Sequence, residues 1–539
     1  MKKIGLIIAF SALVCSAWAV PARRGEIVKT QPDGTQIVVY QHGDEHFHWM
    51  TNEKGEWLKM DIDGFYRVTE ALSAEQIEAK RMAAPSRAAQ AATPLNIAPR
   101  GLVILVNFTD VAFETDKAEM DSMLTGKNYT RDYSYFYRGK KQSITSKGSA
   151  WQYFYDSSNG HYDTQFDVIG PVTVSKNMAY YGKNVNNFDA APWTMVEEAC
   201  QLVDDSVDFK QYDNNNDGDV DFVYVIYAGY GEADGGDKNT IWPHSYWLLK
   251  GAGITCKLDG KYVDLYACGN EMDSRTNYHT GIGTFCHEFS HVLGLPDLYE
   301  TTGYGTHKTI GAWSILDYGP YNNDGNTPPA YSAYEQFFMG WLMPRLIVDA
   351  ENVELEELQE SNSALLISSS DQHNLIGNDP KPTTFYLLEN RQQVGWDEYL
   401  PGHGLMLTKV QYDYNKWLEN EVNNSSNRMG VDLIEADGKK PSSSSNGYTG
   451  KAGDLFPAGA TEYLGITNHS IEDVSEQDGI IYFKYRGGIA TSTEQVQTEE
   501  TIVAIYNILG QKQAAVDIES LPHGTYVVVT TAGSKKIVR

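Results

Sequence analysis

Basic residues are scarce in this chain of 539 residues, and so are long apolar runs. Lys and Arg number 43 against 71 Asp and Glu, so the formal net charge is −28. A chain this acidic repels nucleic acid and anionic membrane surfaces, so neither is expected as a partner. Beyond the first 19 residues, no stretch reaches the roughly 18 consecutive apolar residues of a transmembrane helix. The 48 glycines and 41% hydrophobic residues instead favour a folded, loop-rich protein of several domains.

Cysteine is also rare, with five in the whole chain. Cys15 lies within the first 19 residues. The four others, which include Cys200, are too few for a disulfide scaffold. Cys256 and Cys268 could pair across a hairpin, although their spacing alone does not establish the bond. Cys286 fits a small, buried apolar residue.

The first 19 residues have the pattern of a signal peptide. Two lysines at positions 2 and 3 precede an apolar run at 4–14, which is too short to span a bilayer. Ala17-Trp18-Ala19 fits a small-x-small cleavage site, so we expect the processed chain to begin near Val20. A lipoprotein anchored at Cys15 is the alternative, but residues 12–14 fit a lipobox poorly.

The clearest chemical signal is the pattern H-E-x-x-H-x-x-G-x-x-D, which runs from His287 to Asp297. On a helix, positions i and i+4 share one face, so His287 and His291 can direct two imidazoles at one point. Gly294 can adopt the positive φ that ends a helix and turns the chain back, which would bring Asp297 round as a third ligand.

These residue types suit zinc, which accepts imidazole nitrogen and carboxylate oxygen. Three protein ligands leave one position open for water, and zinc lowers the pKa of that water from about 16 to about 7. Glu288 directly follows the first histidine, where it can take the proton of the water as general base. An amphipathic helix that carries two histidines by coincidence is the alternative.

His287 to Asp297, continued by Leu298-Tyr299, resembles the zinc signature of the immune inhibitor A family of secreted metallopeptidases, which are metzincin-like zincins. The resemblance extends over most of residues 98–485. It implies His287, His291 and Asp297 as zinc ligands and Glu288 as the catalytic base. It also implies an α+β fold with a zincin or metzincin-like catalytic domain at 98–344, preceded by a prosegment and followed by β-rich domains.

Within this region, apolar runs at 101–108 and 222–227 predict buried strands, and 193–205 predicts an amphipathic helix. An aromatic helix is expected between Pro328 and Trp341. From 345 to 486 short strands and turns predict a β-rich subdomain packed on the peptidase.

The sequence departs from the metzincin pattern at one place. Leu316 stands where a methionine turn would lie beneath the zinc, a swap of similar volume that need not inactivate the site. Tyr318, two places later, is a candidate to contact the metal or the developing oxyanion, or else packs in the core. Glu335 is the alternative third ligand to Asp297, and His244 is expected to be structural.

Residues 20–97 resemble a prosegment with a linker. Turn-rich strands come first, and Ala, Ser, Gln, Lys and Arg dominate at 72–94. The segment has no cysteine, so latency would depend on a carboxylate, a histidine or steric blockage. A histidine cluster could touch the metal or simply lie at the surface: His42, His46 and His48. Basic sites for nicking are Lys80, Arg81, Arg87 and Arg100.

Alternating oxygen side chains with Gly218 at the sixth place predict a site for Ca²⁺ or another hard cation. The candidate ligands are Asp213, Asn215, Asp217, Asp219 and Asp221. The loop differs from an EF-hand because its twelfth residue is Tyr224 rather than Glu, and a turn with solvated aspartates is the alternative.

A polar linker at 487–501 precedes a tail at 502–539 that resembles the C-terminal sorting domain of the type IX secretion system. An ordinary β-domain that binds carbohydrate or protein is the alternative. The sorting domain implies secretion machinery as a partner. It also implies a route through the periplasm to the medium or the outer-membrane surface.

Together these features predict a secreted zinc endopeptidase that acts on proteins or peptides. Two other functions remain open, namely a surface adhesin on an inactive peptidase scaffold and a zinc hydrolase of non-peptide amides. The sequence gives no substrate preference.

Overall fold

A computed structural model of the protein describes most of the chain. The described residues are 19–44, 47–61, 63–73, 75–77, 100–185, 188–302, 307–368, 382–440, 449–488, 502–507, 525–530 and 533–538. They belong to two compact units, Met1–Gly487 and Gly488–Arg539. Within the described part, no helix has both the length and the apolar character needed to cross a membrane. The expected signal peptide lies outside the described residues except for Ala19.

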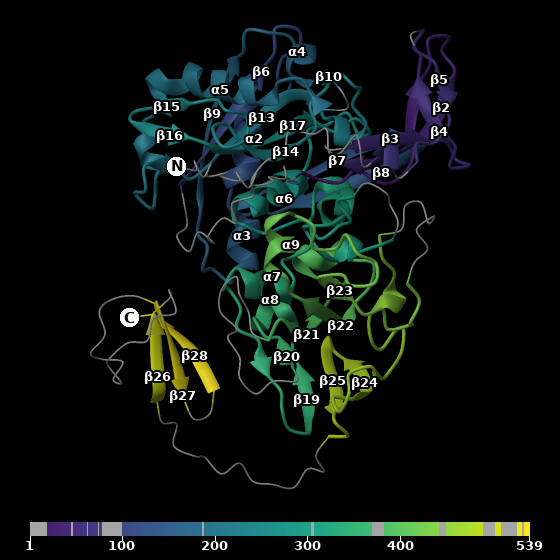
Figure 1. Ribbon diagram of the computed structural model, residues 1–539, viewed down its shortest axis with the longest axis vertical. Helices are drawn as coiled ribbons and strands as arrows, with labels where there is room; N and C mark the ends of the chain where they lie inside the picture. Colours follow the sequence, from purple (N-terminus) through teal and green to yellow (C-terminus); the bar gives the residue numbers. More distant parts are fainter. Residues whose placement is uncertain are drawn as a thin grey trace, which may run out of the picture. The chain divides into compact units, whose positions relative to one another are not determined.

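A five-stranded sheet lies in the upper part of the first unit as drawn in Figure 1, in the order β14-β17-β13-β6-β9. Four strands are parallel and β14 is antiparallel at the edge. Their bounds are β6 Arg100–Asn107, β9 Gln165–Thr173, β13 Val223–Tyr230, β14 His244–Trp247 and β17 Leu265–Met272. The two strands predicted at 101–108 and 222–227 are therefore confirmed as β6 and β13.

Both faces of this sheet are buried, which explains the unbroken apolar run of β6. Val103 and Leu105 point into one hydrophobic cluster, while Leu102, Ile104 and Val106 point into another. Helices from separate parts of the chain supply side chains to the two clusters. They are α2 Lys117–Thr125, α3 Ala150–Ser157 and α6 Gly283–Val292 on the first face, and α4 Met178–Gly182 and α5 Pro192–Val203 on the second.

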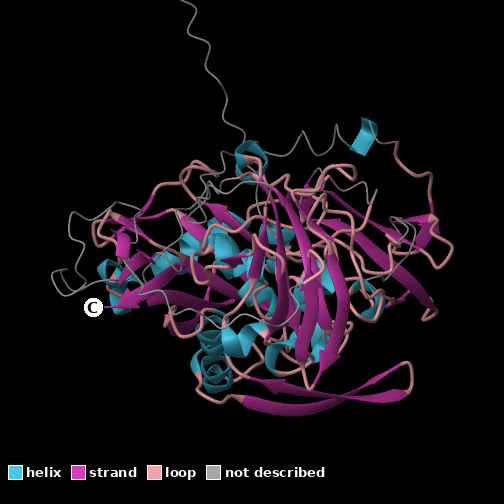
Figure 2. Ribbon diagram, turned by 90° about the horizontal axis from the view of Figure 1, so that it is seen from below, coloured by secondary structure: helices cyan, strands magenta, loops and turns pink. Residues whose placement is uncertain are grey.

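The predicted helix at 193–205 is α5, whose last residues continue as the 3-10 turn η1, Asp204–Ser206. Short hairpins and ribbons surround the sheet, and Figure 2 shows the helices as short segments among the strands. These ribbons are β7 Thr130–Tyr137 with β8 Lys140–Lys147, β10 Asn184–Val185 with β11 Phe188–Asp189, and β12 Asp219–Val220 with β16 Lys261–Val263 and β15 Cys256–Leu258.

The predicted β-rich region consists of a five-stranded and a three-stranded sheet around a shared core. The first contains β18 Arg345–Leu346, β20 Leu365–Ile367, β21 Thr384–Arg391, β22 Gly404–Gln411 and β23 Val431–Leu433. The second contains β19 Glu351–Leu355, β25 Ile480–Tyr485 and β24 Ile471–Gln477. Three short helices accompany them, namely α7 Ala333–Phe338, α8 Leu358–Ser361 and α9 Tyr414–Leu418.

A buried arginine fastens the β-rich region to the peptidase region. Arg391 is fully buried and forms ion pairs with Asp397 and Glu389. Its guanidinium also donates to the carbonyl oxygens of Trp313 at 3.4 Å and Ala330 at 3.2 Å. Since a buried charge is stable only when it is paired and hydrogen-bonded, these contacts hold the two regions in one arrangement.

An antiparallel meander lies at the N-terminal end of the unit, with β2, β4 and β5 standing away from the central sheet and β3 approaching it (Figure 1). Its strands are β1 Ile27–Thr30, β2 Gln36–Asp44, β3 Phe47–Thr51, β4 Trp57–Met60 and β5 Tyr66–Val68. We call residues 19–77 the N-terminal segment. Most of the predicted linker that follows lies outside the described residues.

The second unit contains three antiparallel strands, β26 Ile502–Asn507, β27 Thr525–Thr530 and β28 Gly533–Val538. These strands agree with the expected β-rich tail. Its role in sorting stays a prediction, and nearly all of the predicted linker at 487–501 lies outside the described residues.

The four described cysteines are free and buried. Cys256 and Cys268 do not face each other across a hairpin, because β15 pairs with β16 while β17 pairs with β13 and β14. The Cys256 thiol instead hydrogen-bonds to Cys200, and the Cys268 sulfur lies 3.5 Å from Nδ1 of His244.

Candidate metal centre

Helix α6 brings the two motif histidines together at the centre of the buried core. His287 and His291 are one turn apart, and their Nε2 atoms lie 3.0 Å from each other. The helix ends at Val292 with Leu293 as its C-cap, and Gly294 takes a φ of 97°, as the motif predicts. The returning chain places Oδ1 of Asp297 3.3 Å from Nε2 of His287 and 3.2 Å from Nε2 of His291.

Backbone carbonyls fix the orientation of both rings. Nδ1 of His287 donates to Ile315 O at 2.7 Å, and Nδ1 of His291 donates to Leu295 O at 2.8 Å. A carbonyl only accepts, so the proton of each neutral ring is on Nδ1 and both Nε2 lone pairs face Asp297. Burial and then the neighbouring His291 lower the pKa of His287, which favours the neutral form that metals bind. Leu316, fully buried, follows Ile315 in this turn.

Asp297, the third member of the cluster, is held by a residue that sequence reasoning missed. Asn420 donates its amide to Oδ2 of Asp297 at 2.7 Å and accepts from the backbone N–H of Asp297 at 2.8 Å. Oδ1 of Asp297 is buried and has no hydrogen-bond partner among the described residues. No motif marks Asn420, which is 123 residues away.

This arrangement fits a divalent metal. In the described part of the chain, one group of three or more His, Cys, Asp or Glu residues has all its ligand atoms within 4.8 Å of one another, namely His287, His291 and Asp297. Two neutral imidazoles and one carboxylate oxygen form the donor set of a three-ligand zinc site. The orphaned Oδ1 atom and the two facing lone pairs are explained if a cation lies between them.

A peptide group of the N-terminal segment contacts Glu288, the residue that follows His287 in the chain. Oε1 of Glu288 accepts a hydrogen bond from the backbone N–H of Val20 at 2.9 Å. The hydroxyl of Tyr299 donates to the carbonyl oxygen of Ala19 at 2.6 Å. Trp242 donates to Val20 O at 3.0 Å, and Tyr321 donates to Pro21 O at 2.7 Å. Side chains of the peptidase region therefore hydrogen-bond to the peptide backbone at residues 19–21.

The other sequence candidates have separate partners. The guanidinium of Arg24 covers the ring of Tyr318, 3.4 Å from its centroid, and burial raises the pKa of this tyrosine. Glu335 caps helix α7, where it accepts from the backbone N–H of Ser332 at 2.6 Å and from the hydroxyl of Ser314. Nδ1 of His244 bonds to the carbonyl of Trp242 at 2.7 Å. The described histidines of the prosegment also lie elsewhere: His42 bonds to Thr51 and His48 to Glu232, while His46 is outside the described residues.

The predicted calcium loop has a lysine among its acids. Nζ of Lys261 forms an ion pair with Asp213, whose carboxylate also accepts from the backbone N–H groups of Asp217 and Gly218. Asp221 accepts a hydrogen bond from the side-chain amide of Asn214. Asn215 and Asp219 belong to the same turn. Calcium binding here stays a prediction, and a cation would have to compete with Lys261.

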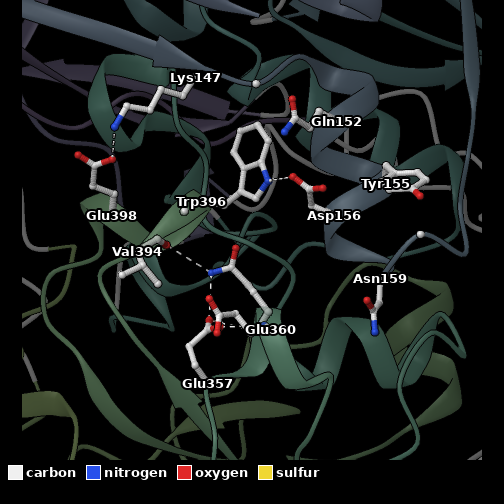
Figure 3. Close-up of a pocket in the computed structure, with 14 residues that line it drawn as sticks. Lys147, Gln152, Tyr155, Asp156, Asn159, Glu357, Glu360, Val394, Trp396 and Glu398 are labelled. Atoms are coloured by element: carbon white, nitrogen blue, oxygen red, sulfur yellow. Dashed lines mark hydrogen bonds and ion pairs between the residues drawn. The ribbon is translucent and has the colours of Figure 1, made fainter. Parts of the chain in front are cut away.

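A surface hollow of about 500 Å³ lies away from this chemistry (Figure 3). Trp396 stands at its centre and donates to Asp156 at 2.9 Å, and Lys147 pairs with Glu398 at its rim. None of the clustered histidines or acids lines it. A second hollow, of about 440 Å³, lies beside the backbone of the N-terminal segment. Its lining includes Arg23, Arg24, Tyr318 and Tyr321.

The fold and the cluster define the class of protein as a candidate metallopeptidase. Comparisons with known proteins agree: residues 96–343 match the model of the immune inhibitor A peptidase M6 catalytic domain. The chain is 26% identical over 293 residues to the pre-pro-metalloprotease PrtV of Vibrio cholerae serotype O1. This aligned region covers 48% of this chain and 31% of that protein. The chain is 28% identical over 269 residues to immune inhibitor A of Bacillus thuringiensis subsp. alesti. This aligned region covers 44% of this chain and 39% of the relative.

The chain thus spans well under half the length of the curated relatives it matches. The matched region includes the whole cluster and Glu288, and it ends before the β-rich region and Asn420. The family match and the names of the relatives support a metalloprotease.

Proposed function

We propose that the protein is a secreted, zinc-dependent endopeptidase that hydrolyses peptide bonds of proteins. The observation that carries this proposal is the peptide group Ala19–Val20, which lies with its nitrogen at Glu288 and its carbonyl at Tyr299 beside the His287, His291 and Asp297 cluster. A peptide bond to be cleaved needs the same contacts. It requires a group that can take a proton from water and pass it to the leaving nitrogen, and a donor at the carbonyl oxygen.

His287, His291 and Asp297 would hold the zinc ion through Nε2, Nε2 and Oδ1. When bound, zinc supplies a Lewis acid and lowers the pKa of water to about 7. Glu288 takes a proton from the attacking water and later delivers it to the leaving nitrogen, the role that its 2.9 Å contact with Val20 N supports. Tyr299 donates to the carbonyl oxygen as negative charge develops there, and Tyr318 is the alternative donor that sequence reasoning suggested.

We also propose that residues 20–97 keep the enzyme latent by steric blockage. The first described residues fill the place of a substrate, and cleavage after Ala19 would leave the α-amino group of Val20 beside Glu288. In this proposal residues 98–344 and 345–486 act as one peptidase. The signal peptide and the tail at 502–539 direct secretion through the type IX machinery.

The test is hydrolysis of casein or gelatin by Glu288→Ala after limited proteolysis has removed the N-terminal segment. Loss of the general base should lower the rate by about 100-fold or more, because such groups contribute about 10²- to 10⁴-fold. Glu398→Gln, at a surface ion pair far from the cluster, is the matched control and should keep full activity. A chelator should abolish activity and added zinc should restore it. Unchanged hydrolysis by Glu288→Ala would falsify the proposal.

A further inference from the structure

We propose that Asp234, Asp273 and Asp324 form a substrate pocket for a cationic side chain, preferably arginine, at the fourth residue on the C-terminal side of the cleaved bond. This inference rests on the proposed peptidase function, and it adds a substrate preference to it.

The pocket is defined by the residue that fills it. The side chain of Arg23 enters from the N-terminal segment and is 7% exposed. Its Nη1 pairs with Oδ2 of Asp273, and its Nη2 lies 2.9 Å from Oδ1 of Asp324. The ring of Tyr321 packs 5.7 Å from the guanidinium carbon. A planar fork that reaches two separate carboxylates suits arginine better than lysine.

The acids of the pocket outnumber its own cations. Asp273 is 4% exposed and Asp234 is 7% exposed, and Oδ1 of Asp234 has no hydrogen-bond partner in the described part of the chain. Burial and then the charge of Asp273 raise the pKa of Asp234 to about 8. Arg275, which pairs with Asp324, is the pocket's own guanidinium. Without Arg23, three carboxyl groups would face that one cation.

Removal of the N-terminal segment therefore takes the cation away from Oδ2 of Asp273, while Oδ1 keeps the backbone N–H groups of Arg275 and Thr276. An uncompensated buried carboxylate is costly, and a cation from another chain relieves that cost. Arg23 and Asp324 both line the surface hollow to which Tyr318, Tyr321 and Asn322 also contribute. A substrate with a cationic side chain in this position would restore the pairing.

The backbone contacts set the position along the substrate. Val20 N lies at Glu288, Val20 O accepts from Trp242, and Arg23 N donates to Ala233 O at 2.8 Å. If the nitrogen of Val20 marks the place of the leaving nitrogen, Val20 stands at the first residue after the cleaved bond. Arg23 then stands at the fourth.

The experiment uses the full-length protein loaded with zinc and activated by limited proteolysis. Three quenched-fluorescent peptides differ only at the fourth residue after the cleaved bond, which is arginine, its neutral isostere citrulline, or glutamate. We expect kcat/KM to fall about 10- to 100-fold from arginine to citrulline, the range for hydrogen bonds to charged groups, and further for glutamate. Asp273→Asn should shrink the difference between arginine and citrulline, and Asp132→Asn, on the exposed hairpin, should not.

A binding series decides the question without catalysis. The hexapeptide Val-Pro-Ala-Arg-Arg-Gly, which copies residues 20–25, should bind the activated protein more tightly than its citrulline variant at position four. Citrulline at position five is the matched control and should cost less. Equal binding and equal cleavage of all variants would overturn the pocket and leave the peptidase proposal intact. Absence of cleavage in every peptide, with the arginine preference kept in binding, would count against the peptidase function alone.

Discussion

At the scale of single residues, the two oxygens of Asp297 have separate tasks. Asn420 occupies Oδ2 with its amide, which leaves Oδ1 to face the two histidines. A carboxylate held in this way offers one oxygen in a fixed direction. Outer partners of this kind orient a ligand and typically change metal affinity by about 10- to 100-fold when they are lost.

The metal content of purified variants should reflect these separate roles of Asp297 and Asn420. Asp297→Ala should lose zinc, because only two ligands remain, while Asn420→Ala should fold and bind zinc about 10- to 100-fold more weakly in competition with a chelator. Glu335→Ala should retain zinc, since its carboxylate is engaged in capping α7. Elemental analysis and chelator titration measure both quantities. Zinc kept by Asp297→Ala and lost by Glu335→Ala would reverse the assignment of the third ligand.

The sequence predicted the cluster because its spacing is local. His287 and His291 are neighbours on any helix, and Gly294 permits the turn that returns Asp297. Asn420 and Tyr299 could not be predicted in the same way. Asn420 reaches the site across 123 residues, and the contact of Tyr299 depends on where the N-terminal segment docks.

At the scale of elements, strand β3 carries the histidine that ties the N-terminal segment to the peptidase region. Nε2 of His48 lies 3.0 Å from Glu232, and the imidazole stacks on Trp242 with ring centroids 4.7 Å apart. Burial alone would lower the pKa of His48, but the carboxylate of Glu232 outweighs it and raises this pKa above the ordinary 6.5. Docking of this strand is therefore coupled to uptake of a proton.

Release of the N-terminal segment should accordingly become easier as pH rises. The docked pKa of His48 is raised, so its contribution is fully present below pH 6.5 and is lost as pH rises through the docked value. After nicking, the dissociation constant of the segment should increase as pH rises above 6.5 and through the raised docked pKa of His48. His48→Gln should flatten this dependence. His42→Gln is the control, because burial lowers the pKa of His42 to about 4 and it stays neutral throughout. A pH profile unchanged by His48→Gln would contradict the coupling.

Strands were more predictable than helix ends. The apolar run of β6 needs both faces of a sheet covered, and it has them. The aromatic helix expected from Pro328 to Trp341 is only Ala333–Phe338, because Ser332 and Glu335 form a capping box that starts it late. The antiparallel place of β14 beside β17 depends on long-range pairing that local pattern does not encode.

At the scale of the whole molecule, processing should follow the boundaries of the described units. We expect a mature enzyme that begins between about residues 82 and 101 and ends near 487–501, since nicks fall in exposed polar segments. The division at Gly487 and Gly488 agrees with the second boundary. Mass spectrometry of the secreted form measures both ends. An active species that still runs from Val20 to Arg539 would contradict latency, because Val20 contacts Glu288.

The contacts of Asn420 and Arg391 also bear on how such an enzyme can be inherited. The family match ends at residue 343, yet both of these residues lie beyond it. A gene fusion that copied residues 96–343 alone would transmit the whole histidine signature without the amide that aims Asp297 or the guanidinium that anchors Trp313 and Ala330. The stretch that recombination must move intact therefore extends at least from β6 to Asn420.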